Sequence, residues 1–381
     1  MFMFKFGGDA ISCGQNALDY IATLSCKAAL VVTSGPLAAQ IGQLKAVTDQ
    51  LDKIGARYTC FDGIEPNPEF SSILAGARMA LEFQPDLIIG LGGGSAIDAS
   101  KAVWAVYENP ELDSLEKLRQ PGAIKVLRQK ARLLVVPTTS GTGSEMTRSV
   151  VISDAENGVK VPVADMRMIP DYAVLSPELT VTMPASLTAN TGLDALTHAL
   201  EAYVSIRAND FSDALAEKTT QILLEYLPLA LEEPANLLYR EKLQNAATMA
   251  GMSFAFVGLG VTHSIAHTFG GVFHVPHGLA NAIVLPYVLA YNRSDEAVDA
   301  KYRHLEQLCR VEDLTATVTA LKQQLKVPAC MRDVVPDAEK YEALSAMLVE
   351  NALKDMCLVT NPVAVSAQQM KALMDKVYYG A

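Results

Sequence analysis

The sequence predicts two domains, a parallel α/β domain over residues 1–182 and an all-helical domain over residues 183–381. In the first, aliphatic runs of strand length alternate with helical patterns. In the second, long amphipathic segments rich in Ala and Leu follow one another without strands between them. Half of the 381 residues are hydrophobic, so each domain has enough apolar side chains for its own core.

The strands expected in the first domain are short aliphatic runs that end in Gly, Ser or Thr. They cover residues 27–35, 86–95 and 132–144, and helical patterns cover residues 69–83 and 95–108. A repeated strand, turn and helix favours a parallel sheet whose ligand-binding loops follow the carboxyl ends of the strands.

The second domain is expected to contain only helices. Apolar residues recur there at the 3.6-residue period of a buried helix face. The segments are residues 192–205, 213–231, 241–256, a stretch near 316–325, and 366–379. We find no internal repeat, coiled coil or low-complexity linker.

Composition narrows the class of protein. A net charge of -11 argues against a nucleic-acid or anionic-membrane partner, because both require a basic surface. No apolar run reaches the roughly 20 residues needed to span a bilayer, and the N-terminal stretch lacks the basic segment of a secretory signal. Six cysteines without a CxxC pair indicate reduced thiols, so we expect a cytoplasmic protein.

Two loops at predicted strand ends are candidates for binding a dinucleotide. In "GLGGGSAID" a glycine-rich turn opens a helix, where backbone N–H groups and the helix dipole attract a pyrophosphate. Gly90, Gly92 and Gly93 do not fit the usual GxGxxG spacing, so a generic turn is the alternative for this loop alone. The hydroxyl-rich "PTTSGTGSE" is a second such loop and favours the dinucleotide. Asp98 either orients the first loop or contacts the nicotinamide side.

Five residues of the second domain have metal-ligand spacing. Asp194 and His198 lie four apart, so both project from one helix face, and His263 and His267 repeat that spacing. His277 follows shortly before another helix. One carboxylate and three imidazoles suit Fe²⁺ or Zn²⁺. Spacing alone leaves open whether His263 or His267 is the ligand.

Each of these residues also has a structural alternative. Asp194 could be a solvated charge, but its neighbours are apolar. His263 and His267 could be a core pair, although burying two imidazoles in an apolar segment requires polar partners. We expect His274 to pack or lie at the surface and His304 to be an ordinary exposed helix residue.

Several long motifs occur in one order along nearly the whole chain: "GGGSAIDASK", "PTTSGTGSEMT", "GVKVPVADMRMIPDYAVLSPEL", "TANTGLDALTHALEAYVS" and "GLGVTHSIAHTFGG" with "HGLANA". Together they resemble the iron-containing (group III) alcohol dehydrogenases, and most of all the propanol dehydrogenases of propanediol-utilising bacteria. The resemblance implies the dehydroquinate synthase-like fold: an α/β dinucleotide-binding domain, an all-α metal-binding domain, and an active site in the cleft between them.

The resemblance also assigns roles to individual residues. The metal ligands are Asp194, His198, His263 and His277. The proton-relay group beside the nicotinamide and substrate is His267. The cofactor is held at its pyrophosphate by Gly92, Gly93, Gly94 and Ser95, at the second loop by Thr138, Thr139 and Thr142, and at the nicotinamide ribose by Lys160.

The implied activity is hydride transfer between a nicotinamide coenzyme and a small primary alcohol or aldehyde such as propanol or propanal. The implied ion is Fe²⁺, although Zn²⁺ suits the same ligands. The family often has Asp where the first strand here ends in Ser34, so we expect NAD to be used and NADP tolerated. It also often has "NPR" where this chain has "NPV" at residues 361–363. A homodimer or larger oligomer is expected, either free in the cytoplasm or within a bacterial microcompartment.

Two other functions are compatible with part of these features. A metal-dependent lyase of the dehydroquinate synthase type would share the dinucleotide domain but would need Lys and Arg for an anionic substrate. Residues 191–204 and 251–284 contain neither. A protein that binds the cofactor without catalysis is disfavoured by the complete set of metal-ligand candidates.

Overall fold

The structure is a computed structural model that describes residues 7–154 and 159–380, so most of the N-terminal stretch considered for a secretory signal lies outside it. The chain divides into two compact units. Unit 1 comprises Met1–Thr182 and Ala235–Thr248, and unit 2 comprises Met183–Pro234 and Met249–Ala381. The segment 235–248, expected from the sequence in the helical domain, therefore clusters with unit 1. The division falls inside helix α8 (Leu237–Val257).

A six-stranded parallel sheet forms the centre of unit 1, as predicted, in the order β1-β8-β5-β4-β2-β3. Every residue of β2 and of β4 is buried, which is the pattern of strands covered on both faces. The bounds are β1 Ala10–Cys13, β2 Ala28–Thr33, β3 Arg57–Phe61, β4 Leu87–Gly92, β5 Arg132–Pro137 and β8 Tyr172–Leu175.

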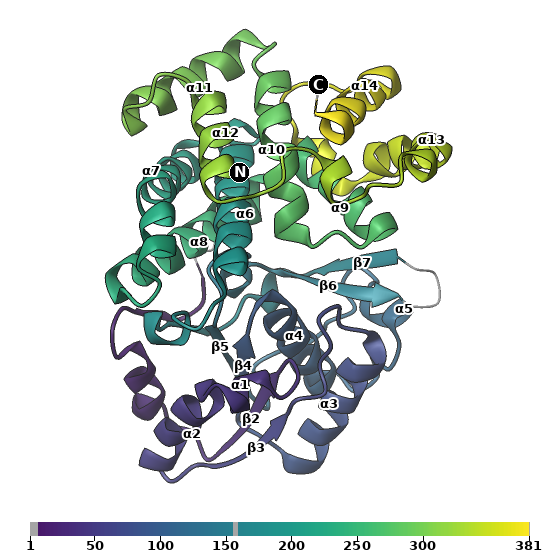
Figure 1. The fold of residues 1–381 in the computed structure, drawn as a ribbon. Coiled ribbons are helices and arrows are strands. Elements are labelled where there is room, and N and C mark those ends of the chain that lie inside the picture. The colour runs from purple at the N-terminus through teal and green to yellow at the C-terminus, as the bar shows by residue number, and fades with distance from the viewer. Residues whose placement is uncertain (1–6, 155–158, 381) are drawn as a thin grey trace. The chain divides into compact units, whose positions relative to one another are not determined.

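Helices cover both faces of this sheet (Figure 1). One face packs on α2 (Gln43–Lys53) and the 3-10 helix η1 (Ala17–Thr23). The other face packs on α4 (Gly94–Glu108). The contact is close where Gly90 of β4 meets Ser100 of α4, because a Cβ at Gly90 would lie 2.2 Å from the Ser100 hydroxyl. The remaining helical segments of this part are α1 Leu37–Gln40, α3 Phe70–Phe83, α5 Leu115–Leu118, η2 Ser144–Met146, η3 Met166–Met168 and η4 Pro177–Leu179.

A second, two-stranded sheet was not foreseen from the sequence. Strands β6 (Ser149–Asp154) and β7 (Val159–Ala164) pair antiparallel. They follow the hydroxyl-rich loop, and Val151 of β6 donates its backbone N–H to Asp98 on α4 at 3.0 Å. The hairpin is therefore tied to the first turns of the helix that opens at the glycine-rich loop.

Unit 2 is built from helices alone among its described residues, and this confirms the predicted fold class. Helix α6 is buried along most of its length, and a Cβ at its Gly192 would lie 2.5 Å from Leu227 of α7. The helices are α6 Ala185–Val204, α7 Asp210–Glu232, the end of α8, α9 Val261–Phe273, α10 His277–Asn292, α11 Glu296–Cys309, α12 Leu314–Gln324, α13 Ala338–Lys354 and α14 Ala367–Tyr379, with η5 Met331–Asp333 and η6 Met356–Thr360.

Within the part of the chain that the structure describes, no single helix is both long and apolar enough to cross a bilayer. Helices α8 and α9 meet that length and composition only when taken together, and they are bent by 102° at their junction.

Candidate metal centre and coenzyme loops

The two candidate coenzyme loops lie side by side at the carboxyl end of the sheet in unit 1. Gly92 at the end of β4 pairs with Pro137 at the end of β5, and Thr138 donates its backbone N–H to Gly92 O at 2.9 Å. Gly92 has φ +145° and would place a Cβ 2.8 Å from Ala96. Only glycine fits that conformation without strain, so the turn brings the backbone close to the first turn of α4.

The threonines of the second loop contact the glycines of the first. A Cβ at Gly94 would lie 2.8 Å from Thr142, and one at Gly93 would lie 3.4 Å from Thr139. Gly93 is the N-cap of the 15-residue α4, whose amino end favours a bound anion. The structure thus brings together the pyrophosphate glycines and the hydroxyl-rich loop expected from the sequence.

Three other predicted coenzyme residues differ in their exposure and in their hydrogen-bond partners. Ser95 donates its hydroxyl to the carbonyl of Pro66, so its side chain is engaged with the protein. Lys160 is exposed on β7. Ser34 follows β2, and its buried hydroxyl has no hydrogen-bond partner among the described residues.

Asp98 is tied to the second loop. Its carboxylate accepts hydrogen bonds from Ser144 and from the backbone of Val151, and it lies 3.7 Å from the buried ammonium group of Lys101. Lys101 also donates to Thr147 at 3.0 Å. Of the two roles considered for Asp98, these contacts support orientation of the loop.

The metal-ligand candidates of unit 2 converge from three helices. Asp194 and His198 lie on α6, His263 on α9, and His277 is the first residue of α10. One ligand atom from each lies within 4.8 Å of the others, and all but His277 are buried. Gly278 allows this approach, because a Cβ there would lie 2.7 Å from the backbone oxygen of Asn190 on α6.

The donor set fits a four-ligand metal site. Asp194 Oδ1 lies 3.6 Å from His277 Nε2 and 4.0 Å from His263 Nε2. Ligands bound tetrahedrally at 2.0–2.1 Å would be about 3.4 Å apart, so these atoms are close to ligating positions. His277 is only partly buried, but desolvation of its ring within the cluster lowers its pKa to about 3. Its imidazole is therefore neutral, the form that binds metal.

The amide of Asn281 marks the point on which the ligand atoms converge. Its Nδ2 donates to Asp194 Oδ1 at 2.7 Å and lies 3.1 Å from the Nε2 atoms of His263 and His277. The amide nitrogen has two protons to donate, so it can satisfy at most two of these three atoms at once. Burial alone raises the pKa of the Asp194 carboxyl, but the imidazoles and Asn281 around it lower that pKa below its usual value. Asp194 is therefore an anion aimed at the same point.

Glu201 supports His263 from behind. Its carboxylate lies 2.6 Å from His263 Nδ1 and accepts the backbone N–H groups of Gly260 and Thr262 at 2.9 and 2.6 Å. Burial alone raises the pKa of Glu201, but these donors lower it below its usual value. An ionised Glu201 can only accept, so Nδ1 of His263 carries the proton and Nε2 is left for a metal.

His267 lies outside the four-atom cluster and has its own carboxylate. Its Nδ1 lies 2.8 Å from Asp355 Oδ2, and its side chain is 39% exposed. Its ring stacks on that of His277, with the centroids 5.2 Å apart. The geometry therefore places His263 with the other three ligand candidates and His267 beside them, the alternative that spacing could not decide.

The other two histidines lie outside this cluster. His274 is exposed and ends α9 in the left-handed conformation, with φ +57°. His304 is exposed and lies 3.5 Å from Glu217. Asn361, of the "NPV" segment, accepts the backbone N–H of Val261 at 3.2 Å and so caps the start of α9.

Sequence reasoning missed Glu201, Asn281 and Asp355. Glu201 had a signal, because positions 194, 198 and 201 share one face of a helix. Asn281 follows His277 by one turn of α10. Asp355 lies 88 residues after His267, and no local pattern joins them.

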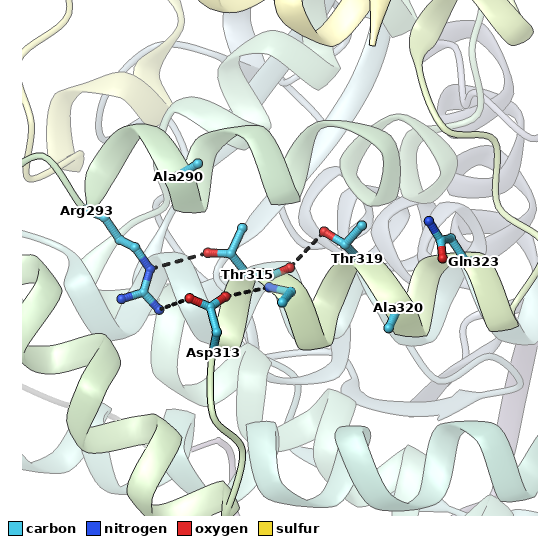
Figure 2. A pocket seen from close by; sticks show the side chains of 8 residues that line it. Ala290, Arg293, Asp313, Thr315, Thr319, Ala320 and Gln323 are labelled. Carbon is cyan, nitrogen blue, oxygen red and sulfur yellow. Dashed lines mark hydrogen bonds and ion pairs between the residues drawn. The ribbon is translucent and has the colours of Figure 1, made fainter. Parts of the chain in front are cut away.

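A hollow of about 670 Å³ between α10 and α12 offers no comparable chemistry (Figure 2). Arg293 donates to Thr315 at 3.3 Å and lies 4.0 Å from Asp313. Asp313 also accepts the backbone N–H of Ala316 at the start of α12. Arg293 also donates to Asp299 and Glu306, so its charge is already engaged, and none of the metal-ligand candidates lines the hollow.

Both halves of the chain match models of one known protein family. Residues 8–177 match the family model described as iron-containing alcohol dehydrogenase, and residues 188–378 match its C-terminal model. The chain is 38% identical to a 1-propanol dehydrogenase of Citrobacter freundii and 36% identical to an NADPH-dependent butanol dehydrogenase of Clostridium saccharobutylicum, with 96% of each chain covered.

Solved structures show the same fold over the full length. An iron-containing alcohol dehydrogenase from Thermococcus thioreducens superposes with a TM-score of 0.92 at 31% identity and covers 100% of both chains. A 1,3-propanediol oxidoreductase superposes with a TM-score of 0.91 at 31% identity, over 99% of this chain and 100% of that one. The chain belongs to the iron-containing alcohol dehydrogenase family.

Proposed function

We propose that this enzyme interconverts small unbranched primary alcohols and aldehydes, with propanol and propanal as preferred substrates. The observation that carries the proposal is the convergence of Asp194, His198, His263 and His277 on one point. Two of the similar proteins described above are named for 1-propanol and butanol. The absence of Lys and Arg from residues 191–204 and 251–284 suits an uncharged substrate and does not favour the lyase alternative.

The metal ion and the nicotinamide coenzyme would supply different parts of the reaction. Iron held by the four ligands would polarise the substrate oxygen as a Lewis acid. The nicotinamide coenzyme would exchange hydride with the carbinol carbon. The protein holds the ligands in place: Glu201 fixes the tautomer of His263, and Asn281 holds the Asp194 carboxylate.

We assign to His267 the transfer of the proton to and from the substrate oxygen. The hydrogen bond to Asp355 holds a proton on Nδ1 and leaves Nε2 to exchange one with the substrate oxygen, directly or through water. Burial alone raises the pKa of Asp355, but the hydrogen bond and charge of His267 and the backbone of Cys357 lower it below its usual value. An ionised Asp355 is the acceptor that this role requires.

The test is a substrate panel. Iron-loaded protein, prepared without oxygen, is assayed for NADH and NADPH oxidation with linear aldehydes from acetaldehyde to hexanal and with branched and carboxylated analogues. The proposal expects the highest kcat/KM with propanal or butanal and little turnover of anionic substrates. A preference for a carboxylated or phosphorylated substrate would contradict it.

The setting of the enzyme is part of the proposal. We propose a cytoplasmic enzyme, free or within a microcompartment, that forms a homodimer or larger oligomer. The six cysteines, all free in the structure, support a reducing compartment. Light scattering of the purified protein and fractionation of the producing cells would test these points.

A further inference from the structure

A second group of metal-binding side chains lies beside the first. His267 of α9, Asp355 at the start of η6, and Cys357 two residues later bring one imidazole nitrogen, one carboxylate oxygen and one sulfur within 4.8 Å of one another. Asp355 connects the other two: its Oδ2 lies 2.8 Å from His267 Nδ1, and its Oδ1 accepts the backbone N–H of Cys357 at 2.8 Å.

We propose that His267, Asp355 and Cys357 form a second, inhibitory site for a zinc-like divalent ion. An ion there takes the lone pair of His267 Nδ1 and leaves the ring proton on Nε2, so that Nε2 can no longer accept a proton from the substrate. The inhibitory part rests on the proposed function, whereas ion binding by the three side chains does not.

The ligand chemistry distinguishes the two sites. Thiolate, imidazole and carboxylate together suit Zn²⁺, whose softer ligands include sulfur. The four-ligand cluster contains no sulfur. Three protein ligands leave the fourth tetrahedral position of zinc to water, and the His267 side chain, 39% exposed, lets solvent and ions reach the site.

Charge permits both sites to be filled together. The stacked rings of His267 and His277 keep the two ions apart, with centroids 5.2 Å from each other. Asp194 and Glu201 supply two negative charges at the first site, and Asp355 with a Cys357 thiolate supplies two at the second. Two divalent ions are therefore balanced by four anionic groups.

The second site should be the weaker one. Three protein side chains hold an ion at the second site, against four at the first, so the second ion has fewer bonds to the protein. We therefore expect the second ion to bind only after the four-ligand cluster is full.

Cobalt makes the second site visible, because a thiolate bound to Co²⁺ produces a charge-transfer band in the near ultraviolet. Metal-free protein is first given one equivalent of Zn²⁺, which cobalt does not displace from nitrogen and oxygen ligands. Co²⁺ is then titrated in without oxygen. The proposal expects a band that saturates at about one cobalt per chain.

The matched variants are Cys357→Ala and Cys309→Ala. Both cysteines are partly buried in unit 2, but Cys309 belongs to no ligand cluster among the described residues. The band should disappear in Cys357→Ala and remain in Cys309→Ala. Absence of the band in wild type, or its survival in Cys357→Ala, would overturn the second site.

Activity tests the inhibitory part. Excess Zn²⁺ is added to iron-loaded wild type and to Cys357→Ala, and the apparent inhibition constant should rise by about 10-fold or more in the variant. Loss of iron from the first site affects both proteins equally, so the difference reports on the second. Equal inhibition would refute the inhibitory role. A protein that reduces no aldehyde would refute the proposed function, while the cobalt band would still decide the site.

Discussion

Glu201 Oε2 and His263 Nδ1 lie 2.6 Å apart, and both side chains are buried. The same carboxylate accepts two backbone N–H groups at the start of α9, so it is fixed by the helix on which His263 stands. A Cβ at Gly260 would lie 2.9 Å from Glu201, and the contact therefore also depends on a glycine. Such a carboxylate orients a ligating imidazole and increases its basicity.

We expect Glu201→Gln to lower the affinity for the first metal ion by about 10- to 100-fold, because a neutral amide with one acceptor oxygen instead of two holds the proton on Nδ1 of His263 less firmly. Competition with a chromophoric chelator measures the affinity. Glu217→Gln, in the same unit but outside the ligand cluster, is the control. Unchanged affinity in Glu201→Gln, with the fold intact by circular dichroism, would show that Glu201 has no part in metal binding.

His267→Ala should keep the first metal ion but reduce kcat by roughly 10²–10⁴-fold, the contribution of a general acid–base group. Asp355→Asn should show a smaller loss of the same kind. His304→Ala removes an exposed histidine that lies outside the cluster and should leave kcat unchanged. If His267→Ala instead emerges without the first metal, His267 is a ligand and the assignment of His263 is wrong.

Iron should make the activity sensitive to air. Oxygen converts Fe²⁺ to Fe³⁺, so we expect activity to decay in air and to return when Fe²⁺ is added without oxygen. The same four ligands also suit Zn²⁺, and zinc-loaded protein serves as the air-stable comparison. Activity that persists for days in air, with zinc bound and no response to iron, would identify zinc as the native ion.

Ser34 should permit NADP(H). No carboxylate stands at this position to repel a 2′-phosphate, and the buried Ser34 hydroxyl has no partner among the described residues. We expect kcat/KM for NADH and NADPH to differ by less than about 100-fold, since one charged contact contributes roughly 1–3 kcal/mol.

Ser34→Asp is the matched variant for the coenzyme prediction and should lose NADPH activity selectively. Stronger rejection of NADPH by the wild type would mean that another residue excludes the phosphate. The ratio is measured with one aldehyde at saturation.

The strands and helices nearest the coenzyme loops were predictable because their patterns are local. The aliphatic runs at residues 27–35 and 86–95 became β2 and β4, and the helix expected over 95–108 became α4. The antiparallel hairpin of β6 and β7 was missed, as was the clustering of residues 235–248 with unit 1. The clustering depends on tertiary contacts that no local period encodes. The hairpin did have a local signal, because the buried Val150, Ile152, Val161 and Val163 alternate along the two strands.

The ligand cluster was predictable in part. Helical spacing placed Asp194 with His198, and it left His263 and His267 equivalent. The structure separates these two histidines through their partners, because Glu201 contacts His263 and Asp355 contacts His267. Those contacts span 62 and 88 residues, so only the folded chain shows them.

The central claim is that the four-ligand cluster holds the iron on which alcohol dehydrogenase activity depends. Asp194→Ala tests it most directly, since it removes the buried carboxylate that contacts Asn281 and faces the imidazoles. Iron content and propanal reduction are measured on wild type and variant purified in parallel without oxygen. We predict about one iron per chain and turnover in the wild type, and neither in Asp194→Ala. Full iron occupancy together with wild-type turnover in Asp194→Ala would contradict the account.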